Sequence, residues 1–281
     1  MLTINTVFEL QNLIIDLKKQ GKTIGFAPTM GALHEGHLSL IAKAKSECDI
    51  SVCSIFVNPT QFNDPKDLEK YPRTEEKDSK MLLSAGNDIL FMPSVNEIYP
   101  PDLDLKNTID FGEMAHVMEG AFRPGHFDGM AQVVKRLLDI VQPNRLFMGQ
   151  KDFQQFSIVQ NMLFQLKSDI QLIMCETMRE NDGLAMSSRN IRLTPEHRKK
   201  APLIYKTLLK AKKMSAKKSP EDIKKWAISQ FLSPDFKPEY FDIVDGKTLQ
   251  SITNFETTGF VVACVATWLG EVRLIDNVVV K

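Results

Sequence analysis

The chain has 281 residues, a length typical of about two domains of ordinary size. Hydrophobic residues make up 43% of it, which is enough for a buried core and excludes a disordered chain or a minimal disulfide-stapled fold. Thirty-five basic and thirty-five acidic side chains give a formal net charge of zero. This balance argues against a nucleic-acid partner bound by bulk charge and leaves a small anionic ligand open.

Neither a membrane segment nor a disulfide framework is indicated. The longest apolar run, 260–269, is far shorter than the roughly 20 residues that a membrane-spanning helix needs. The first residues carry Glu9 and Asp16 among apolar side chains, unlike a secretory signal, so we expect a cytoplasmic protein with no membrane partner. The four cysteines are scattered without a C-x-x-C pair, so we expect reduced, buried thiols.

Apolar spacing and turn residues predict alternating helices and strands up to about residue 177. The predicted helices cover 7–17, 37–47, 75–85, 130–141 and 152–166, and the strands cover 23–27, 50–57, 89–92, 145–148 and 170–175. Such alternation implies a parallel sheet with ligands at the carboxyl ends of its strands. Beyond this point a smaller α+β domain is predicted, with helices over 195–213 and 220–231 and strands over 240–244, 259–267 and 272–280.

The sequence PTMGALHEGH covers residues 28–37, between the first predicted strand and a helix. Gly31 and Gly36 allow tight turns, and the unpaired N–H groups of a helix start favour an anion such as a triphosphate. His34 and His37 are three residues apart, so they can face the same side, and the positive end of the helix favours neutral imidazoles. Structural or surface histidines are the alternative, and a zinc site of the H-E-x-x-H type would need a spacing of four.

Two further polar segments follow predicted strands. Asn58 and Gln61, in FVNPTQF, offer uncharged donors and acceptors for a small polar substrate, and the first two strands should end side by side. In GQKDFQQ, Lys151 can meet phosphate oxygens and Asp152 is placed like a helix cap. Gln155 lies one turn further along and would face the same crevice as Gln61 if their strands are neighbours. An ordinary turn or helix cap is the alternative for each segment.

Two loops complete the set of candidate segments. RPGHFDG, residues 123–129, is polar and loop-like. MRENDGLAMSSRN, residues 178–190, lies at the proposed domain junction, where a mobile loop with Ser187, Ser188 and Arg189 can close over a triphosphate. Its donors would stabilise the charge that develops as pyrophosphate leaves. Taken alone, Ser-Ser-Arg is a weak signal that more often belongs to an ordinary polar loop.

These motifs resemble a known family when they are taken together. HEGH at 34–37 resembles the HIGH motif of the nucleotidyltransferase superfamily, and MSSR at 186–189 resembles its KMSKS loop. The ordered blocks PTMGALHEGHLSL, SIFVNPTQF, EKYPRT, RPGHFDG, GQKDFQQ, DGLAMSSRN and LIDN are similar to those of the pantoate-β-alanine ligases. The resemblance implies an α/β fold, with a Rossmann-like parallel sheet that binds ATP and pantoate over residues 1–177. Residues 178–281 would form the smaller α+β domain, which carries the MSSR loop.

The implied activity is a two-step ligation in pantothenate biosynthesis. ATP and (R)-pantoate would give pantoyl adenylate and pyrophosphate, and β-alanine would then displace AMP to give pantothenate, with Mg²⁺ assisting. The resemblance also implies a homodimer. The residues fit this chemistry, because a carboxylate becomes a good electrophile once it is adenylated, and holding two anions together calls for hydrogen-bond donors and no covalent nucleophile.

The resemblance also implies a role for each candidate residue. His37 would be the proton donor and His34 would lie beside the phosphates. Catalytic donors would further include Lys151, Ser187, Ser188 and Arg189. The ATP site would comprise Met30, Gly31, Ala32, Leu33, His34, Glu35, Gly36, His37, Gly149, Gln150, Lys151, Asp152, Met178, Met186, Ser187, Ser188 and Arg189. Gln61 and Gln155 would hold pantoate, the Gln61 region would also receive β-alanine, and Asn58 would contact substrate. The metal ligands cannot be read from the sequence. Asp78 is one candidate, and an exposed helix carboxylate is the alternative for it.

Two other functions remain as alternatives. An adenylyltransferase of the same superfamily would transfer AMP to a phosphate group, but the uncharged NPTQF and GQKDFQQ segments do not suit a phosphate acceptor. A binding module without enzymatic activity would not account for glutamines and a lysine gathered at three strand ends.

Overall fold

The computed structural model describes residues 1–62, 68–69, 71–103 and 109–281. Its internal contacts divide the chain into two units. The first unit comprises Met1–Phe111, Arg123–Gly149 and Ile158–Glu176, and the second comprises Gly112–Phe122, Gln150–Ser157 and Thr177–Lys281. Each unit is thus assembled from separate stretches of chain. The functional division into domains 1–177 and 178–281 stays a prediction.

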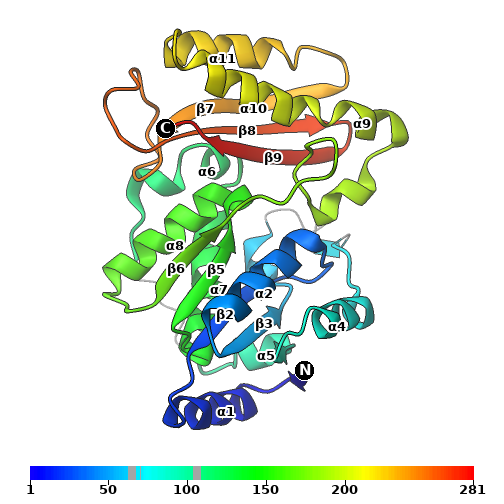
Figure 1. Ribbon diagram of the computed structural model, residues 1–281, viewed down its shortest axis with the longest axis vertical. Coiled ribbons are helices and arrows are strands. Elements are labelled where there is room, and N and C mark those ends of the chain that lie inside the picture. Colours follow the sequence, from blue (N-terminus) through cyan, green and yellow to red (C-terminus); the bar gives the residue numbers. More distant parts are fainter. Residues whose placement is uncertain (63–67, 70, 104–108) are drawn as a thin grey trace. The chain divides into compact units, whose positions relative to one another are not determined.

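The first unit contains a six-stranded sheet in the order β1-β4-β3-β2-β5-β6 (Figure 1). All of its neighbouring strands pair in parallel, as the α/β alternation predicts. The strands are β1 (Leu2–Ile4), β2 (Ile24–Thr29), β3 (Ile50–Ile55), β4 (Ile89–Phe91), β5 (Arg145–Gly149) and β6 (Gln171–Cys175). The helices are α1 (Val7–Lys19), α2 (Glu35–Glu47), α4 (Glu75–Ser84), α5 (Val95–Ile98) and α7 (His126–Val141), and α8 (Phe153–Gln165) contributes residues to both units. The predicted Rossmann-like sheet is therefore confirmed.

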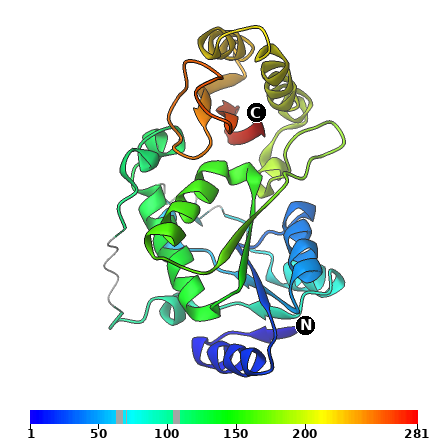
Figure 2. The ribbon, with the colours of Figure 1, turned by 60° about the vertical axis from the view of Figure 1, so that its left-hand side comes forward.

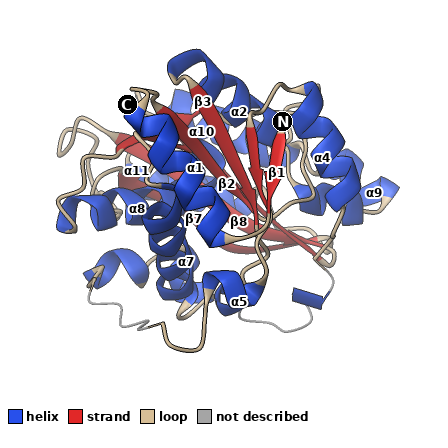
Figure 3. Cartoon of the chain, turned by 90° about the horizontal axis from the view of Figure 1, so that it is seen from below, coloured by secondary structure: helices blue, strands red, loops and turns tan. Residues whose placement is uncertain are grey.

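Helices cover both faces of this sheet. Figure 3 shows α2 and α4 on one side of the parallel strands and α1 and α7 on the other. Strand β2 is accordingly buried on both faces, with Ile24 and Phe26 fully buried. It lies between β3 and β5, and Thr29 at its carboxyl end is paired with Ile55 of β3. The first two predicted strands therefore do end side by side.

Two local predictions need correction, and one strand was missed. Helix α7 begins at His126, immediately after Gly125 (φ 76°), so the second half of the predicted polar loop 123–129 is helical. The helix predicted over 195–213 is broken into α9 (Pro195–Lys200) and α10 (Leu203–Met214), because Pro202 has no N–H to continue the helical bonds. Strand β1 was not predicted, since its three residues are too few to show a periodic pattern.

The second unit contains an antiparallel sheet in the order β7-β8-β9. Its strands are β7 (Phe236–Asp245), β8 (Val261–Leu269) and β9 (Val272–Val279). Helix α10 and helix α11 (Pro220–Ser229) lie against the same side of this sheet (Figures 1 and 2), and their apolar side chains share a core with those of the strands. This arrangement confirms the predicted α+β part. No helix in the described part of the chain is long and apolar enough to cross a membrane.

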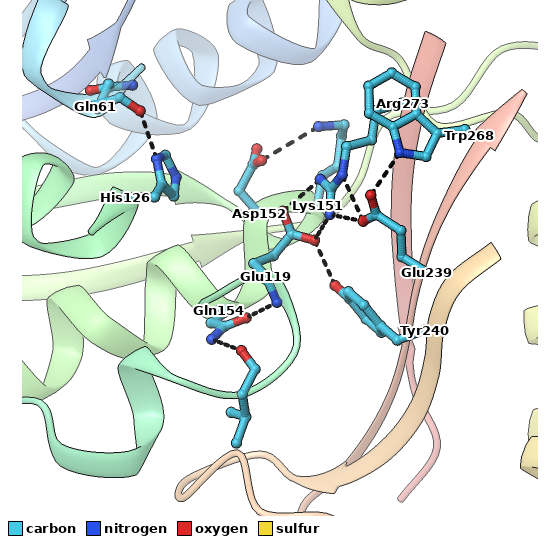
Figure 4. A network of polar contacts seen from close by, with 11 residues as sticks. Gln61, Glu119, His126, Lys151, Asp152, Gln154, Glu239, Tyr240, Trp268 and Arg273 are labelled. Atoms are coloured by element: carbon cyan, nitrogen blue, oxygen red, sulfur yellow. Dashed lines mark hydrogen bonds and ion pairs between the residues drawn. The ribbon is translucent and has the colours of Figure 1, made fainter. Parts of the chain in front are cut away.

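A buried ionic network ties the segment of α6 (Glu119–Phe122) to this sheet (Figure 4). Arg273 of β9 donates two hydrogen bonds of 2.8 Å to the Glu119 carboxylate and two more, of 2.9 and 2.7 Å, to Oε2 of Glu239. Tyr240 donates to Glu119 at 2.7 Å, and Trp268 donates to Glu239 at 2.6 Å. Burial, followed by the Glu119 charge, raises the pKa of Tyr240 well above its ordinary value, so its hydroxyl remains a donor. The Arg273 guanidinium is thus hydrogen-bonded to two carboxylates and is the counter-ion that they share.

We predict that Arg273→Met lowers the free energy of unfolding by about 3 kcal/mol, because it leaves two largely buried carboxylates without their counter-ion. Urea unfolding of this variant beside wild type measures the difference. Lys237→Met is the matched control, since Lys237 is exposed on β7 of the same sheet, and its substitution should change stability by less than about 0.5 kcal/mol. Equal losses in the two variants would show that the network adds nothing.

Candidate active site

The loop that follows β2 is held by a buried carboxylate. Gly31 (φ 82°) and Ala32 (φ 51°) are consecutive residues in the left-handed region, and for Ala32 this conformation costs roughly 1–2 kcal/mol. The backbone N–H groups of Ala32 and Leu33 donate to the two oxygens of Asp78, at 2.8 and 2.9 Å, and Thr74 Oγ1 adds a third bond at 3.1 Å. The hydrogen bonds that Asp78 accepts from these N–H groups offset the conformational cost at Ala32.

This contact corrects one expectation about Asp78. The carboxylate belongs to α4 but is only 1% exposed, so the exposed alternative is wrong. Both of its oxygens already accept bonds from the loop or from Thr74. Within the described ranges, no three side chains of His, Cys, Asp or Glu cluster as metal ligands would. This role leaves no sign in the sequence, because Ala32 and Asp78 are 46 residues apart.

His34 and His37 together cap the start of α2. The Nδ1 atom of His34 accepts a hydrogen bond from Gly36 N–H at 3.1 Å, and the Nδ1 atom of His37 accepts one from His34 N–H at 3.3 Å. The two rings lie 4.1 Å apart, as measured between their centroids. Since each Nδ1 is an acceptor, each neutral ring carries its proton on Nε2. The loop therefore presents two imidazoles whose Nε2–H groups can donate to an anion.

Asn58 and Gln61 form one hydrogen-bonded turn after β3, around η1 (Pro59–Gln61). Asn58 is 1% exposed, and its amide donates to Thr60 Oγ1 at 3.0 Å and to the Gln61 side chain at 3.4 Å. Gln61 Nε2 in turn lies 3.0 Å from the sulfur of Met30, which belongs to the loop after β2. The structure thus brings Gln61 and Met30 together. Asn58 supports the turn, and its contact with substrate stays a prediction.

The RPGHFDG segment supports the same turn. His126 Nδ1 lies 2.9 Å from the backbone oxygen of Gln61 (Figure 4), and a carbonyl can only accept, so this histidine carries its proton on Nδ1. Asn58 also donates to the Gly129 carbonyl at 3.2 Å. A Cβ atom on Gly129 would lie 2.4 Å from the backbone oxygen of Thr60, so only glycine lets α7 approach this closely. The sequence singled out this segment, but its supporting role could not be read from it.

In the second unit, the last three residues of the GQKD motif form the turn η3 (Gln150–Asp152) before α8. Lys151 is partly buried, with 20% of its side chain exposed, and its Nζ lies 3.5 Å from Asp152. Gln154 is buried and accepts a bond from the Glu119 N–H at 3.0 Å (Figure 4). Gln155, the predicted substrate contact, is half-buried on the first turn of α8. Lys151 and Gln155 thus both lie at the start of this helix.

The MSSR segment closes a narrow hairpin in the same unit. Met186 N–H donates to the Met178 carbonyl at 2.9 Å, so the predicted adenine-flanking residue and the MSSR segment are directly paired. Ser187 then caps the turn η4 (Ser188–Arg192), where its hydroxyl oxygen accepts from Arg189 N–H at 3.3 Å. The bond between Arg198 and Asp182 at the tip of the hairpin lowers the pKa of that carboxyl. The two serines and the arginine therefore lie on one short turn.

The cysteines supply no nucleophile. All four are free, and Cys53, Cys175 and Cys264 are buried, as expected. Burial raises the pKa of Cys53 to about 12 and that of Cys175 to about 11, so both thiols are protonated at neutral pH. Cys48 is only partly buried, and burial is again the main cause that raises the pKa of its thiol.

Comparison with known proteins identifies the family. Residues 2–279 match the family model described as pantoate-beta-alanine ligase. The chain belongs to the pantoate-beta-alanine ligase family. It is 50% identical over 277 residues to the pantothenate synthetase of Azobacteroides pseudotrichonymphae, with 98% of each chain covered. It is 48% identical over 276 residues to that of Porphyromonas gingivalis strain W83, with 98% of this chain and 97% of the relative covered.

Solved structures of the family agree with the fold. The pantothenate synthetase of Thermus thermophilus superposes with a TM-score of 0.93 at 39% identity and full coverage of both chains. The pantoate-beta-alanine ligase of Francisella tularensis, solved in complex with beta-gamma ATP and beta-alanine, gives a TM-score of 0.82 at 38% identity. The match covers 100% of this chain and 98% of that one. The family and the α/β fold are thus established together, and the chain is an enzyme of this ligase family.

We predict that Asp78→Asn weakens ATP binding about tenfold, because an amide N–H would then face a backbone N–H and release the loop after β2. Calorimetric titration with ATP measures the effect on folded protein, and urea unfolding should show a loss of about 1–3 kcal/mol. Glu76→Gln is the control, since Glu76 is exposed on the same helix. An unchanged ATP affinity in folded Asp78→Asn protein would mean that the carboxylate does not set the loop.

Proposed function

We propose that this enzyme condenses (R)-pantoate with β-alanine to pantothenate, with ATP cleaved to AMP and pyrophosphate. The observation that carries the proposal is the histidine pair at the start of α2, which presents two Nε2–H donors from a backbone loop ordered by Asp78. A helix N-terminus with donors of this kind suits the phosphates of ATP. The Francisella relative was solved with beta-gamma ATP and beta-alanine, which supports the same pair of ligands here.

In the first step, a pantoate carboxylate oxygen attacks the α-phosphorus of ATP, a bond to that phosphorus forms, and pyrophosphate leaves. Charge accumulates on the phosphate oxygens, so donors that strengthen at that moment lower the barrier. We assign this role to His34, His37 and Lys151, and also to Ser187, Ser188 and Arg189 of the η4 turn. The Nδ1 bonds of the two histidines fix the orientation of both rings at the start of α2.

In the second step, the neutral amine of β-alanine attacks the carbonyl carbon of pantoyl adenylate and an amide bond forms. The bond from that carbon to the bridging oxygen breaks, AMP leaves with this oxygen, and the nitrogen releases a proton to solvent. Gln61 and Gln155 would hold the pantoyl group, and the Gln61 turn would also receive β-alanine. Uncharged amides suit this work, because they can donate to a carboxylate and accept from a hydroxyl at the same time. The backbone of Met178 would flank the adenine.

Mg²⁺ would accompany ATP and neutralise part of the phosphate charge. Magnesium is commonly held by one or two carboxylates together with substrate phosphates and water, so a dedicated protein cage is not required. Asp152 fits such a limited role, since its carboxylate is half exposed beside Lys151 at the start of α8. We further propose a cytoplasmic homodimer, a state that sedimentation of the purified protein can test.

The first prediction is pantoate-dependent exchange of labelled pyrophosphate into ATP in the presence of Mg²⁺ and without β-alanine. Formation of a reversible adenylate requires this exchange, whereas simple ATP binding or AMP transfer to a phosphate group does not. Other small hydroxy acids should support exchange much less well. If ATP binds but pantoate supports no exchange, the nucleotide site is retained and the proposed acid is wrong.

The second prediction is that His37→Ala and Lys151→Ala each lower the exchange rate by on the order of 10²-fold, as loss of a transition-state donor does. His116→Ala and Lys135→Ala are the controls and should keep the wild-type rate, because His116 is exposed and Lys135 has 40% of its side chain exposed. Wild-type exchange in His37→Ala would remove this histidine from the mechanism.

A further inference from the structure

The LIDN segment near the end of β9 carries two buried polar residues for which the proposed reaction has no direct use. Asp276 is 3% exposed and Asn277 is 2% exposed. Buried polar groups are stabilised only when they are hydrogen-bonded, so their partners show what they hold. In both cases the partners are backbone or side-chain groups of segments that carry the predicted ATP-binding motifs.

Asn277 holds the GQKD turn. Its Nδ2 group donates to the backbone oxygens of Gln150 and Lys151, each at 2.9 Å, and its Oδ1 atom accepts from Gln150 Nε2 at 3.1 Å. The amide thus uses both of its donor hydrogens on consecutive carbonyls at the point where β5 has ended and α8 has not begun. The bond to the Lys151 carbonyl fixes the backbone from which the lysine side chain extends.

Asp276 holds the hairpin that leads to MSSR. Arg179 donates to both of its carboxylate oxygens, at 2.7 and 3.0 Å, and also to the Gly183 carbonyl at 3.2 Å. The guanidinium carbon lies 3.6 Å from the centre of the Tyr205 ring, which supports the side chain from α10. Arg179 follows Met178, whose carbonyl is paired with Met186 N–H. The ion pair thus anchors the arm of the hairpin to which the MSSR segment is hydrogen-bonded.

Adjacent residues of a strand point to opposite faces, so this pair reaches both segments at once. The backbone N–H of Asn277 also donates to Asp276 Oδ1 at 2.8 Å, and this bond helps to fix the orientation of the Asp276 carboxylate. We propose that Asp276 and Asn277 are positioning residues that fix the GQKD turn and the MSSR hairpin in one spacing, so that Lys151 and the η4 donors engage the same triphosphate. The inference rests on the proposed function.

The chemistry of the two positions is specific. Position 277 must donate to two carbonyls, which a carboxylate cannot do, because its oxygens would face the Gln150 and Lys151 oxygens. Asn277→Asp keeps the size and shape, removes these donors and introduces an ionisable group. At low pH the introduced carboxyl group becomes protonated and can again donate one bond. Burial among carbonyl oxygens raises the pKa of such a group, which makes this recovery observable.

The test measures pantoate-dependent pyrophosphate exchange of Asn277→Asp and Asn277→Ser from pH 6 to 9. At pH 9 we expect kcat of Asn277→Asp to fall about 10- to 100-fold, as it does when a catalytic group is displaced. We expect a smaller fall in Asn277→Ser, because the serine hydroxyl can still donate one hydrogen bond. The KM for pantoate should stay within about twofold of wild type. The ratio of Asn277→Asp to wild-type activity should rise as the pH falls, and that of Asn277→Ser should not.

Asp242→Asn is the matched control, since Asp242 of β7 lies in the cross-strand row of Asn277 and its carboxylate contacts Ser251, Lys224 and its neighbouring N–H. It should keep wild-type kcat and pH dependence. The inference is overturned if folded Asn277→Asp has wild-type kcat. It is also overturned if the loss of kcat does not change with pH and a lower melting temperature accounts for it. If wild type itself shows no exchange, the proposed function fails instead.

Discussion

Backbone hydrogen-bonding groups at a turn between strand and helix have no partner in either element, and the candidate site depends on how they are paired. Such groups cannot stay unpaired when they are buried. Asp78 accepts the N–H groups of the loop after β2, and Asn277 donates to the carbonyls of the turn after β5. The two turns need opposite chemistry, so a carboxylate serves one and an amide serves the other.

Local pattern was enough to predict most of the fold. The spacing of apolar residues and the glycines and prolines at element ends identified the alternating strands and helices, because those signals act within a few residues. The predicted helix over 195–213 missed the break at Pro202, although proline cannot continue a helix. The start of α7 was also missed, because Gly129 has the look of a loop residue. Its role is to let the helix approach Thr60 closely, and nothing near it in the sequence shows this contact.

The candidate site likewise has parts that the sequence shows and parts that it does not. The HEGH, GQKD and MSSR motifs were visible because their glycines, histidines and donors are close together in the chain. Asp78 acts on residues 46 positions away, and Asn277 acts on Gln150 at a separation of 127. Long-range partners leave no periodic signal in a single sequence, so the supporting residues emerge only from the three-dimensional contacts.

Three histidines show how the backbone selects proton positions. In His34 and His37 the Nδ1 atom accepts a hydrogen bond from a backbone N–H group, so the neutral ring carries its proton on Nε2. In His126 the Nδ1 atom faces a carbonyl oxygen, which can only accept, so the ring carries a proton on Nδ1. The same type of side chain therefore carries its donor hydrogen on Nε2 in the first two cases and on Nδ1 in the third.

The second unit is assembled from pieces that leave the ribosome at very different times. Glu119 and its partner Arg273 are separated by 154 residues, which corresponds to a delay of roughly 10 to 30 s at ordinary rates of translation. Until β9 has emerged, the nascent chain holds Glu119 and the GQKD turn without the groups that neutralise or bond them. The second unit can therefore be completed only when the last strand of the chain has been synthesised.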